Sequence, residues 1–180
     1  TYYDYDGNGN VTRIINPDGS SRQYTYFTYP DGTADLKSET DELGHKIFYV
    51  YDDTHNLLVK AWPRYWGLSE YVSGTNQFIT EKMTYYTTAE AQAMTGAPIS
   101  GMKKTHQDRA GLVTTYRYGA HGNLASKTNT MNQNYQYAYN VIGWLKSETD
   151  PLGNVTKYYY DQAGRLLKKA LPNGGAERYS

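Results

Sequence analysis

The sequence contains no cysteine and no long apolar run, and its charges of the two signs are equal in number. Without cysteine the chain forms no disulfide and offers no thiolate to a metal, although this does not decide its compartment. No apolar run of about 18 residues occurs, so the sequence predicts no membrane span. Eighteen Lys and Arg residues balance 18 Asp and Glu residues, which disfavours nucleic acid and anionic membranes as partners held by charge alone.

Tyrosine and glycine are abundant, in contrast. The chain has 21 Tyr and 17 Gly among its 180 residues, against three Phe, a composition that suits many short strands joined by tight turns. Tyrosine rings are therefore expected to supply much of the buried area, with their hydroxyls reaching polar partners or solvent. The composition predicts an all-β fold with a polar interior.

One spacing of aromatic, acidic, glycine and aliphatic residues recurs at intervals of 21 residues, and its clearest copy runs from Tyr158 to Leu166. Tyr-x-Tyr places two rings on the same face of a strand. The Asp-x-x-Gly that follows suits a hairpin loop with a bulge, because Gly adopts a positive φ at little cost. A second turn of the Pro-x-Gly type, as at Pro17-Asp18-Gly19, ends each two-stranded unit. The repeat positions are Tyr3, Tyr5, Asp6, Gly9, Tyr49, Tyr51, Asp52, Tyr116, Tyr118, Gly122, Tyr137, Tyr139, Gly143, Tyr158, Tyr160, Asp161 and Gly164.

The copy that begins at Gly153 and continues through Tyr158–Leu166 resembles the YD repeats of the Rhs family, which also occur in the C component of Tc toxin complexes and in teneurins. Other copies are degenerate, since Gly119 and Asn140 replace the Asp and His55 replaces the turn Gly. The resemblance implies tandem antiparallel β-hairpins in a continuous twisted sheet, part of a hollow shell that encloses a toxic C-terminal polypeptide. It further implies a bacterial protein, secreted or on the cell surface, whose partners are the rest of its own shell and the enclosed toxin segment.

The repeats are interrupted once, so the sequence divides into YD repeats at 1–57, an insertion at 58–104 and further YD repeats at 105–180. Within the insertion, 78–86 is predicted to be a strand. A short helix is predicted over 87–94, with Thr87 and Glu90 spaced as a capping box and Gly96 available to end it. Because the sequence begins inside a repeat, we expect it to be a piece of a longer chain.

The insertion also concentrates aromatic residues around a basic one, at Trp62, Arg64, Tyr65 and Trp66. Exposed aromatic rings can stack on sugar faces, and long insertions in repeat arrays often carry binding sites. An alternative function is therefore an extracellular module that binds carbohydrate or a cell-surface partner. The same residues also suit a connection that packs beneath a loop and binds nothing.

No arrangement of titratable residues indicates an enzyme, a cofactor or a metal site. The histidines His45, His55, His106 and His121 lie in or beside predicted turns without a metal-binding spacing. The repeated Asp6, Asp52 and Asp161 occupy equivalent turn positions, so one structural role accounts for all three. A third hypothesis, enzymatic activity, has no motif behind it.

Two local motifs have a competing interpretation. The spacing from Asp4 to Thr12 matches the start of a calcium-binding EF-hand loop, but Ile15 stands where the last acidic ligand belongs and the flanks read as strands. The resemblance to the Rhs family also implies a self-cleavage motif, Asp-Pro-x-Gly-Leu, and Asp150-Pro151-Leu152-Gly153 matches four of its five positions, with Asn154 in place of Leu. Both segments also fit ordinary hairpin turns, which is the interpretation that we favour.

Overall fold

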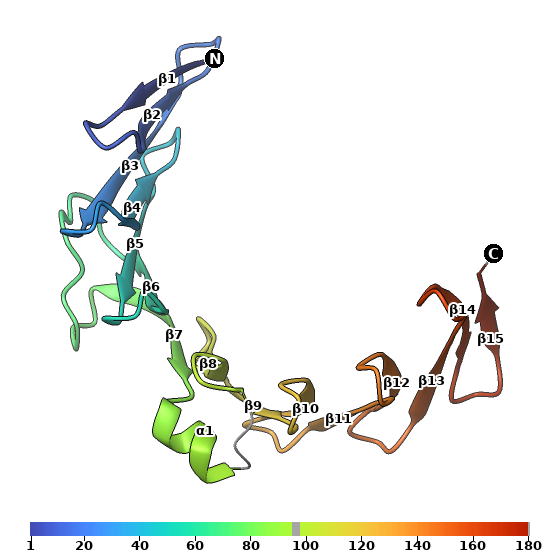
Figure 1. The fold of residues 1–180 in the computed structure, drawn as a ribbon. Coiled ribbons are helices and arrows are strands. Elements are labelled where there is room, and N and C mark those ends of the chain that lie inside the picture. The colour runs from blue at the N-terminus through green and yellow to red at the C-terminus, as the bar shows by residue number, and fades with distance from the viewer. Residues whose placement is uncertain (95–97, 180) are drawn as a thin grey trace. The chain divides into compact units, whose positions relative to one another are not determined.

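The computed structural model describes residues 1–94 and 98–179, and within them it contains 15 strands and one helix (Figure 1). The strands are antiparallel and hydrogen-bonded in the order in which they occur in the chain. This confirms the predicted all-β array of hairpins. In chain order the elements are β1 (Tyr2–Tyr5), β2 (Val11–Ile15), β3 (Ser21–Thr28), β4 (Ala34–Thr40), β5 (Lys46–Tyr51), β6 (Leu57–Pro63), β7 (Phe78–Tyr85), α1 (Thr88–Met94), β8 (Lys103–Gln107), β9 (Val113–Tyr118), β10 (Leu124–Asn129), β11 (Asn134–Tyr139), β12 (Leu145–Thr149), β13 (Val155–Tyr160), β14 (Leu166–Ala170) and β15 (Ala176–Arg178).

The chain divides into two compact units. One comprises Thr1–Met83 with Asp108–Gly111, and the other comprises Thr84–Gln107 with Leu112–Ser180. The three-part division of the repeats read from the sequence stays a prediction. No helix in the described part of the chain is long and apolar enough to cross a membrane.

A single loop geometry closes the hairpins at both ends of the strands. In the first hairpin the N–H of Asp6 donates to the carbonyl of Asn10 and the N–H of Gly9 donates to the carbonyl of Asp6, with Gly9 at φ 84°. This is a type I turn followed by a left-handed residue. Two kinds of turn were expected from Asp-x-x-Gly and Pro-x-Gly, but the same pair of backbone bonds closes the loops that begin at Asp6, Asn16, Tyr29, Asp41, Asp52, Gly119, Asn129, Asn140, Asp150, Asp161 and Leu171.

The loop at Tyr29 has the same length as the other loops although its hairpin is longer. It is closed by the same two backbone bonds as the others, from Tyr29 N–H to the Thr33 carbonyl and from Gly32 N–H to the Tyr29 carbonyl. The additional length instead extends β3, which reaches Thr28. A longer hairpin therefore keeps the common loop.

A bulge follows each Tyr-x-Tyr turn. In the hairpin of β11 and β12, Tyr139 pairs with Leu145 and Ala138 pairs with Ser147, which leaves Lys146 as the extra residue. Register shifts occur at the same place in β1–β2, β3–β4, β5–β6, β9–β10 and β13–β14. Such bulges increase the local right-handed twist of a sheet, so the twist is added once per repeat.

The repeats are also staggered against one another by a constant amount. Tyr137 pairs with Glu148, and Glu148 pairs with Thr156. Tyr158, the repeat equivalent of Tyr137, therefore lies two residues beyond the point directly across the sheet. The same offset occurs in the first repeats. Tyr3 pairs with Ile14 and Ile14 pairs with Arg22, so Tyr24 lies two residues beyond the residue directly across from Tyr3.

That offset makes rows of equivalent residues run obliquely to the strands. Two residues along a strand cover about 7 Å, and two strand spacings cover about 10 Å. Within its unit, each row of equivalent residues is therefore inclined by about 35° to the direction perpendicular to the strands. A register stagger of this kind accompanies the strand tilt of coiled and closed sheets.

The buried apolar residues gather beneath the segments that interrupt the repeats. In the first unit, Phe48, Ala61 and Phe78 form one cluster, on which Leu68 and Tyr71 of the 64–77 connection pack. In the second unit, helix α1 contributes Ala91 to a cluster formed with Tyr86, Ile99, Met102 and Tyr118. Most tyrosines of the regular hairpins are only half-buried or exposed, so the interruptions supply much of the apolar packing.

The predicted helix and strand of the insertion are both confirmed. Strand β7 covers Phe78–Tyr85, and helix α1 begins at Thr88. The capping box is formed, because the Glu90 N–H donates to the Thr87 hydroxyl and the Thr87 N–H donates to the Glu90 carboxylate. The predicted helix end at Gly96 lies outside the described residues.

Candidate functional site

The repeated aspartates act as acceptors for their own loops. Asp161 Oδ1 accepts bonds from the N–H groups of Ala163 and Arg165, both at 2.9 Å, and its Oδ2 lies 2.7 Å from Arg165 Nε. These hydrogen bonds hold the pKa of Asp161 below its usual value, and the bonds from Arg165 have the largest effect. Asp6 and Asp52 make equivalent bonds to the second and fourth residues after them. The arrangement fixes a turn and leaves the carboxylates engaged.

The other predicted repeat positions occupy matching places in their hairpins. The tyrosines lie on strands β1, β5, β9, β11 and β13, and the glycines occupy the left-handed loop position. His55 occupies that position at φ 64°, where its Nδ1 lies 2.7 Å from Asp35 Oδ2 of the neighbouring hairpin. The ring of Tyr29 contacts the His55 ring edge-on at 4.5 Å. These contacts hold a residue that lacks the conformational freedom of Gly.

Two recurring tyrosine contacts join neighbouring hairpins. The hydroxyl of Tyr158 donates to Glu148 at 2.7 Å, and the hydroxyl of Tyr49 donates to Glu39 at 2.5 Å. Burial and the adjacent carboxylate raise the pKa of both tyrosines. The second tyrosine of a pair can instead donate to a backbone carbonyl, as Tyr118 does to Lys103 at 3.0 Å. The strands are thus connected by side chains as well as by the backbone.

The two motifs with competing interpretations lie in hairpin turns. Asp150 Oδ1 accepts bonds from the N–H groups of Leu152 and Asn154, and its Oδ2 accepts from Asn154 Nδ2. Asp6 is bonded in the same way to Asn8 and Asn10. Among the residues that the structure describes, no group of three or more His, Cys, Asp or Glu side chains is arranged to hold a metal ion.

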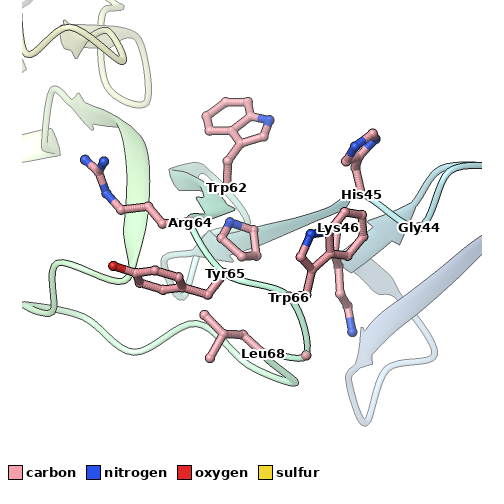
Figure 2. A pocket seen from close by; sticks show the side chains of 10 residues that line it. Gly44, His45, Lys46, Trp62, Arg64, Tyr65, Trp66 and Leu68 are labelled. Atoms are coloured by element: carbon pink, nitrogen blue, oxygen red, sulfur yellow. The ribbon is translucent and has the colours of Figure 1, made fainter.

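The four residues predicted for binding line one pocket in the first unit. Trp62, Arg64, Tyr65 and Trp66 surround a pocket of about 670 Å³ together with Gly44, His45, Lys46, Pro63, Gly67 and Leu68. Figure 2 shows Trp62 between Arg64 and His45, with Tyr65, Trp66 and Leu68 below them. The volume is within the range of small-molecule sites. The end of β6, the start of the 64–77 connection and the loop between β4 and β5 form its walls.

Trp62 is less available than the sequence suggested. The ammonium of Lys60 lies 5.3 Å from its ring centroid and the guanidinium of Arg109 lies 5.0 Å from it. Arg109 is itself 3.8 Å from the carboxylate of Glu81. These cation–π contacts occupy the Trp62 ring. Trp62 therefore forms part of the pocket wall and is less available for stacking on a ligand.

Trp66 and Tyr65 are the accessible rings, with 74% and 64% of their surface exposed. The Trp66 ring lies 5.4 Å from the His45 ring at an interplanar angle of 32°. It also lies against the neighbouring loop, since a Cβ built on Gly44 would be 3.4 Å from Trp66 Cζ3. Trp66 is therefore exposed and yet supported from one side.

The base of the pocket is anchored to the sheet. The N–H of Arg64 donates to the carbonyl of Gln77 at 2.8 Å, which closes the 64–77 connection. Leu68 and Tyr71 then pack on the Phe48 cluster, with the Tyr71 ring 5.1 Å from that of Phe78. The insertion is thus both a packed connection and the wall of a pocket.

His45 and Lys46 are the basic pocket residues that the sequence did not predict. His45 comes from the loop between β4 and β5 and Lys46 is the first residue of β5, and pairing of β5 with β6 brings them beside Trp62. His45 Nδ1 lies 2.9 Å from Asp41 Oδ2. A second pocket of about 290 Å³ shares His45 and Trp62 with the first. In the sequence His45 was predicted only as a residue in or beside a turn, with no signal that this turn lies next to Trp62.

Comparison with known proteins identifies the repeat. Residues 5–26 and 139–176 match the family model described as RHS Repeat. No curated protein matches the chain. The family match confirms the predicted resemblance of the repeats to those of the Rhs family.

Solved structures share the fold. Three crystal structures match with a TM-score of 0.66 over 98% of this chain: TcdB2-TccC3-Cdc42 at 16% identity, TcdB2-TccC3 at 17%, and TcdB2-TccC3 without its hypervariable C-terminal region at 16%. The chain spans 9% of the length of each matched chain. The predicted architecture is therefore found in much larger proteins.

Proposed function

We propose that the chain is a wall segment of an Rhs- or Tc-type toxin shell, which encloses a toxic C-terminal polypeptide until delivery. The observation that carries the proposal is the constant stagger of the hairpins. A sheet whose repeats are offset by the same two residues, with one bulge per repeat, twists in the same sense at each step. Such a sheet is suited to a coiled wall.

The chemistry of the repeats supports a structural role. Their aspartates and glutamates are bonded within turns and to tyrosine hydroxyls, so the repeated charges stabilise the sheet. The fold of this chain matches TcdB2-TccC3 and TcdB2-TccC3 without its hypervariable C-terminal region with the same TM-score of 0.66. By the same reasoning we propose that the chain is bacterial, that it acts in a secreted or cell-surface protein, and that its partners are the rest of its shell and an enclosed segment.

Protease protection tests this proposal. The polypeptide encoded by the whole reading frame around residues 1–180 is digested, and we expect the segment downstream of the repeats to resist cleavage while the repeats stay folded. Replacing Gly143 and Gly164 together by Val opens two loops and is expected to expose that segment. Equal cleavage rates in the native and the opened protein would contradict an enclosing role.

A second candidate function is carbohydrate binding at the pocket of residues 44–46 and 62–68. The specific observation is the exposure of Tyr65 and Trp66 beside an anchored wall. Titration of intrinsic tryptophan fluorescence with oligosaccharides tests it. An unchanged signal with every sugar would remove this candidate and leave the shell proposal untouched.

A further inference from the structure

Basic side chains line the pocket. His45, Lys46 and Arg64 line it, and no Asp or Glu does so within the described residues. The protein as a whole has no net charge, so this is a local excess of basic groups. Such an excess attracts an anionic ligand over distances of about 10 Å at moderate salt.

Arg64 is the basic group available to a ligand. Its side chain is exposed and makes no ion pair with any residue in the described ranges, while its backbone is fixed by the bond to Gln77. Lys46 is partly engaged, because its ammonium lies 5.0 Å from the centroid of the Phe48 ring. A guanidinium is suited to bidentate pairing with a carboxylate or sulfate.

The acidic group that pairs with the pocket residue His45 is Asp41, and it is already engaged. Asp41 Oδ1 accepts the N–H groups of Leu43 and His45, and its Oδ2 pairs with the His45 ring. Asp41 borders the smaller neighbouring pocket and not this one. The carboxylate of Asp41 therefore holds the His45 ring toward the loop. It is not among the residues that line the pocket with Arg64.

The apolar part of the site is flat and exposed. The Trp66 ring, supported by His45 and the Gly44 turn, is the platform, and Tyr65 stands beside it. An aromatic face contacts the C–H face of a sugar ring, and the same ligand can then direct an acidic substituent at Arg64. A nucleic-acid strand would need a basic groove that follows its backbone, and this pocket offers one short basic rim.

We propose that this pocket binds an acidic carbohydrate, with the sugar ring on Trp66 and the carboxylate or sulfate against Arg64. The inference rests on the second candidate function and names its ligand class. It assigns separate tasks to the two residues: Trp66 supports binding of any sugar, whereas Arg64 selects the acidic one.

The test uses two ligands that differ only in charge, a hyaluronan tetrasaccharide and its carboxyl-reduced form, with binding measured by calorimetry. We expect the acidic form to bind about tenfold more tightly, as one charge-assisted pair would provide, and the difference to shrink at high salt. Arg64→Gln removes the difference, and Trp66→Ala weakens both ligands. Arg117→Gln, an exposed arginine on β9 in the other unit, is the matched control and changes neither. Circular dichroism verifies that each variant is folded.

Each other outcome is decisive. Equal affinity for the two forms overturns the acidic specificity and leaves carbohydrate binding in place. Binding of neither form overturns both. Tighter binding of adenosine monophosphate than of either sugar shows that the pocket accepts phosphate and a base, and overturns the carbohydrate class.

Discussion

Replacing Gly164 by alanine is expected to destabilise the second unit more than the same change at Gly153. Both glycines close hairpin loops with nearly equal backbone angles, at φ 82° and 85°. A Cβ at Gly153 would meet no atom within 4 Å, whereas one at Gly164 would lie 2.8 Å from Trp144 Cζ2. The pair therefore separates the cost of the backbone angle from the cost of a close contact.

The magnitudes follow from these two terms. A left-handed conformation costs an L-residue about 1–2 kcal/mol, and this applies to both variants. At Gly164 the indole must also move away, although it contacts the Tyr160 ring at 5.3 Å, and overpacking of this kind adds about 1–2 kcal/mol. We expect losses of about 1–2 kcal/mol for Gly153→Ala and about 2–4 kcal/mol for Gly164→Ala.

Native-state hydrogen exchange of the β13 and β14 amides measures these losses, because the array unfolds in local units. Trp144→Ala provides the control: in that background Gly164→Ala is expected to cost no more than Gly153→Ala. Equal losses for the two single variants, or an unchanged difference after removal of the indole, would refute the reasoning that the ring limits this loop.

Three further outcomes are expected. Although slight burial opposes it, hydrogen bonding lowers the pKa of Asp52 from 3.8 to about 2. The resulting stabilisation is present above pH 4 and is lost as the pH falls toward 2. Acid unfolding followed by circular dichroism measures this loss, and a stability that does not change with pH over this range would contradict it. Tyr158→Phe removes the bond to Glu148 and is expected to cost about 1 kcal/mol in urea unfolding; because the Tyr158 pKa is raised, the wild type also loses stability above pH 10, and the variant loses less. His55→Ala and His55→Gly both lose the pair with Asp35, but only alanine keeps the left-handed strain. We therefore expect the free energy of unfolding of His55→Ala to be about 1 kcal/mol lower than that of His55→Gly, and the reverse order would contradict this.

The hairpin order and the position of most loops could be predicted from the sequence. Glycine at the fourth loop position and Tyr-x-Tyr before the loop are local signals, and local signals set turns and strand faces. The capping box of α1 is likewise local. Two of the described loops lack the glycine, however: the left-handed residues are His55 in the loop that begins at Asp52 and Asn132 in the loop that begins at Asn129.

The stagger and the complete pocket could not be predicted in this way. The stagger depends on which residues pair across two successive hairpins, and the bulge at Lys146 and its equivalents changes that pairing without changing the residue types. His45 joins Trp66 because two segments about 20 residues apart in the sequence meet across the sheet. The aromatic cluster itself was visible in the sequence, but not that Arg109 occupies the Trp62 ring.

The common loop has a consequence for how such a chain can change its length over evolution. Each hairpin meets its neighbours through the same backbone bonds, so a copied unit can be inserted between two others without altering the residues on either side. Two near-identical stretches, Lys37–Gly44 and Lys146–Gly153, carry Glu39 and Glu148 in the same place, and both carboxylates accept a tyrosine hydroxyl. Tandem copying of whole units would therefore enlarge the protein in fixed increments while every junction stayed compatible.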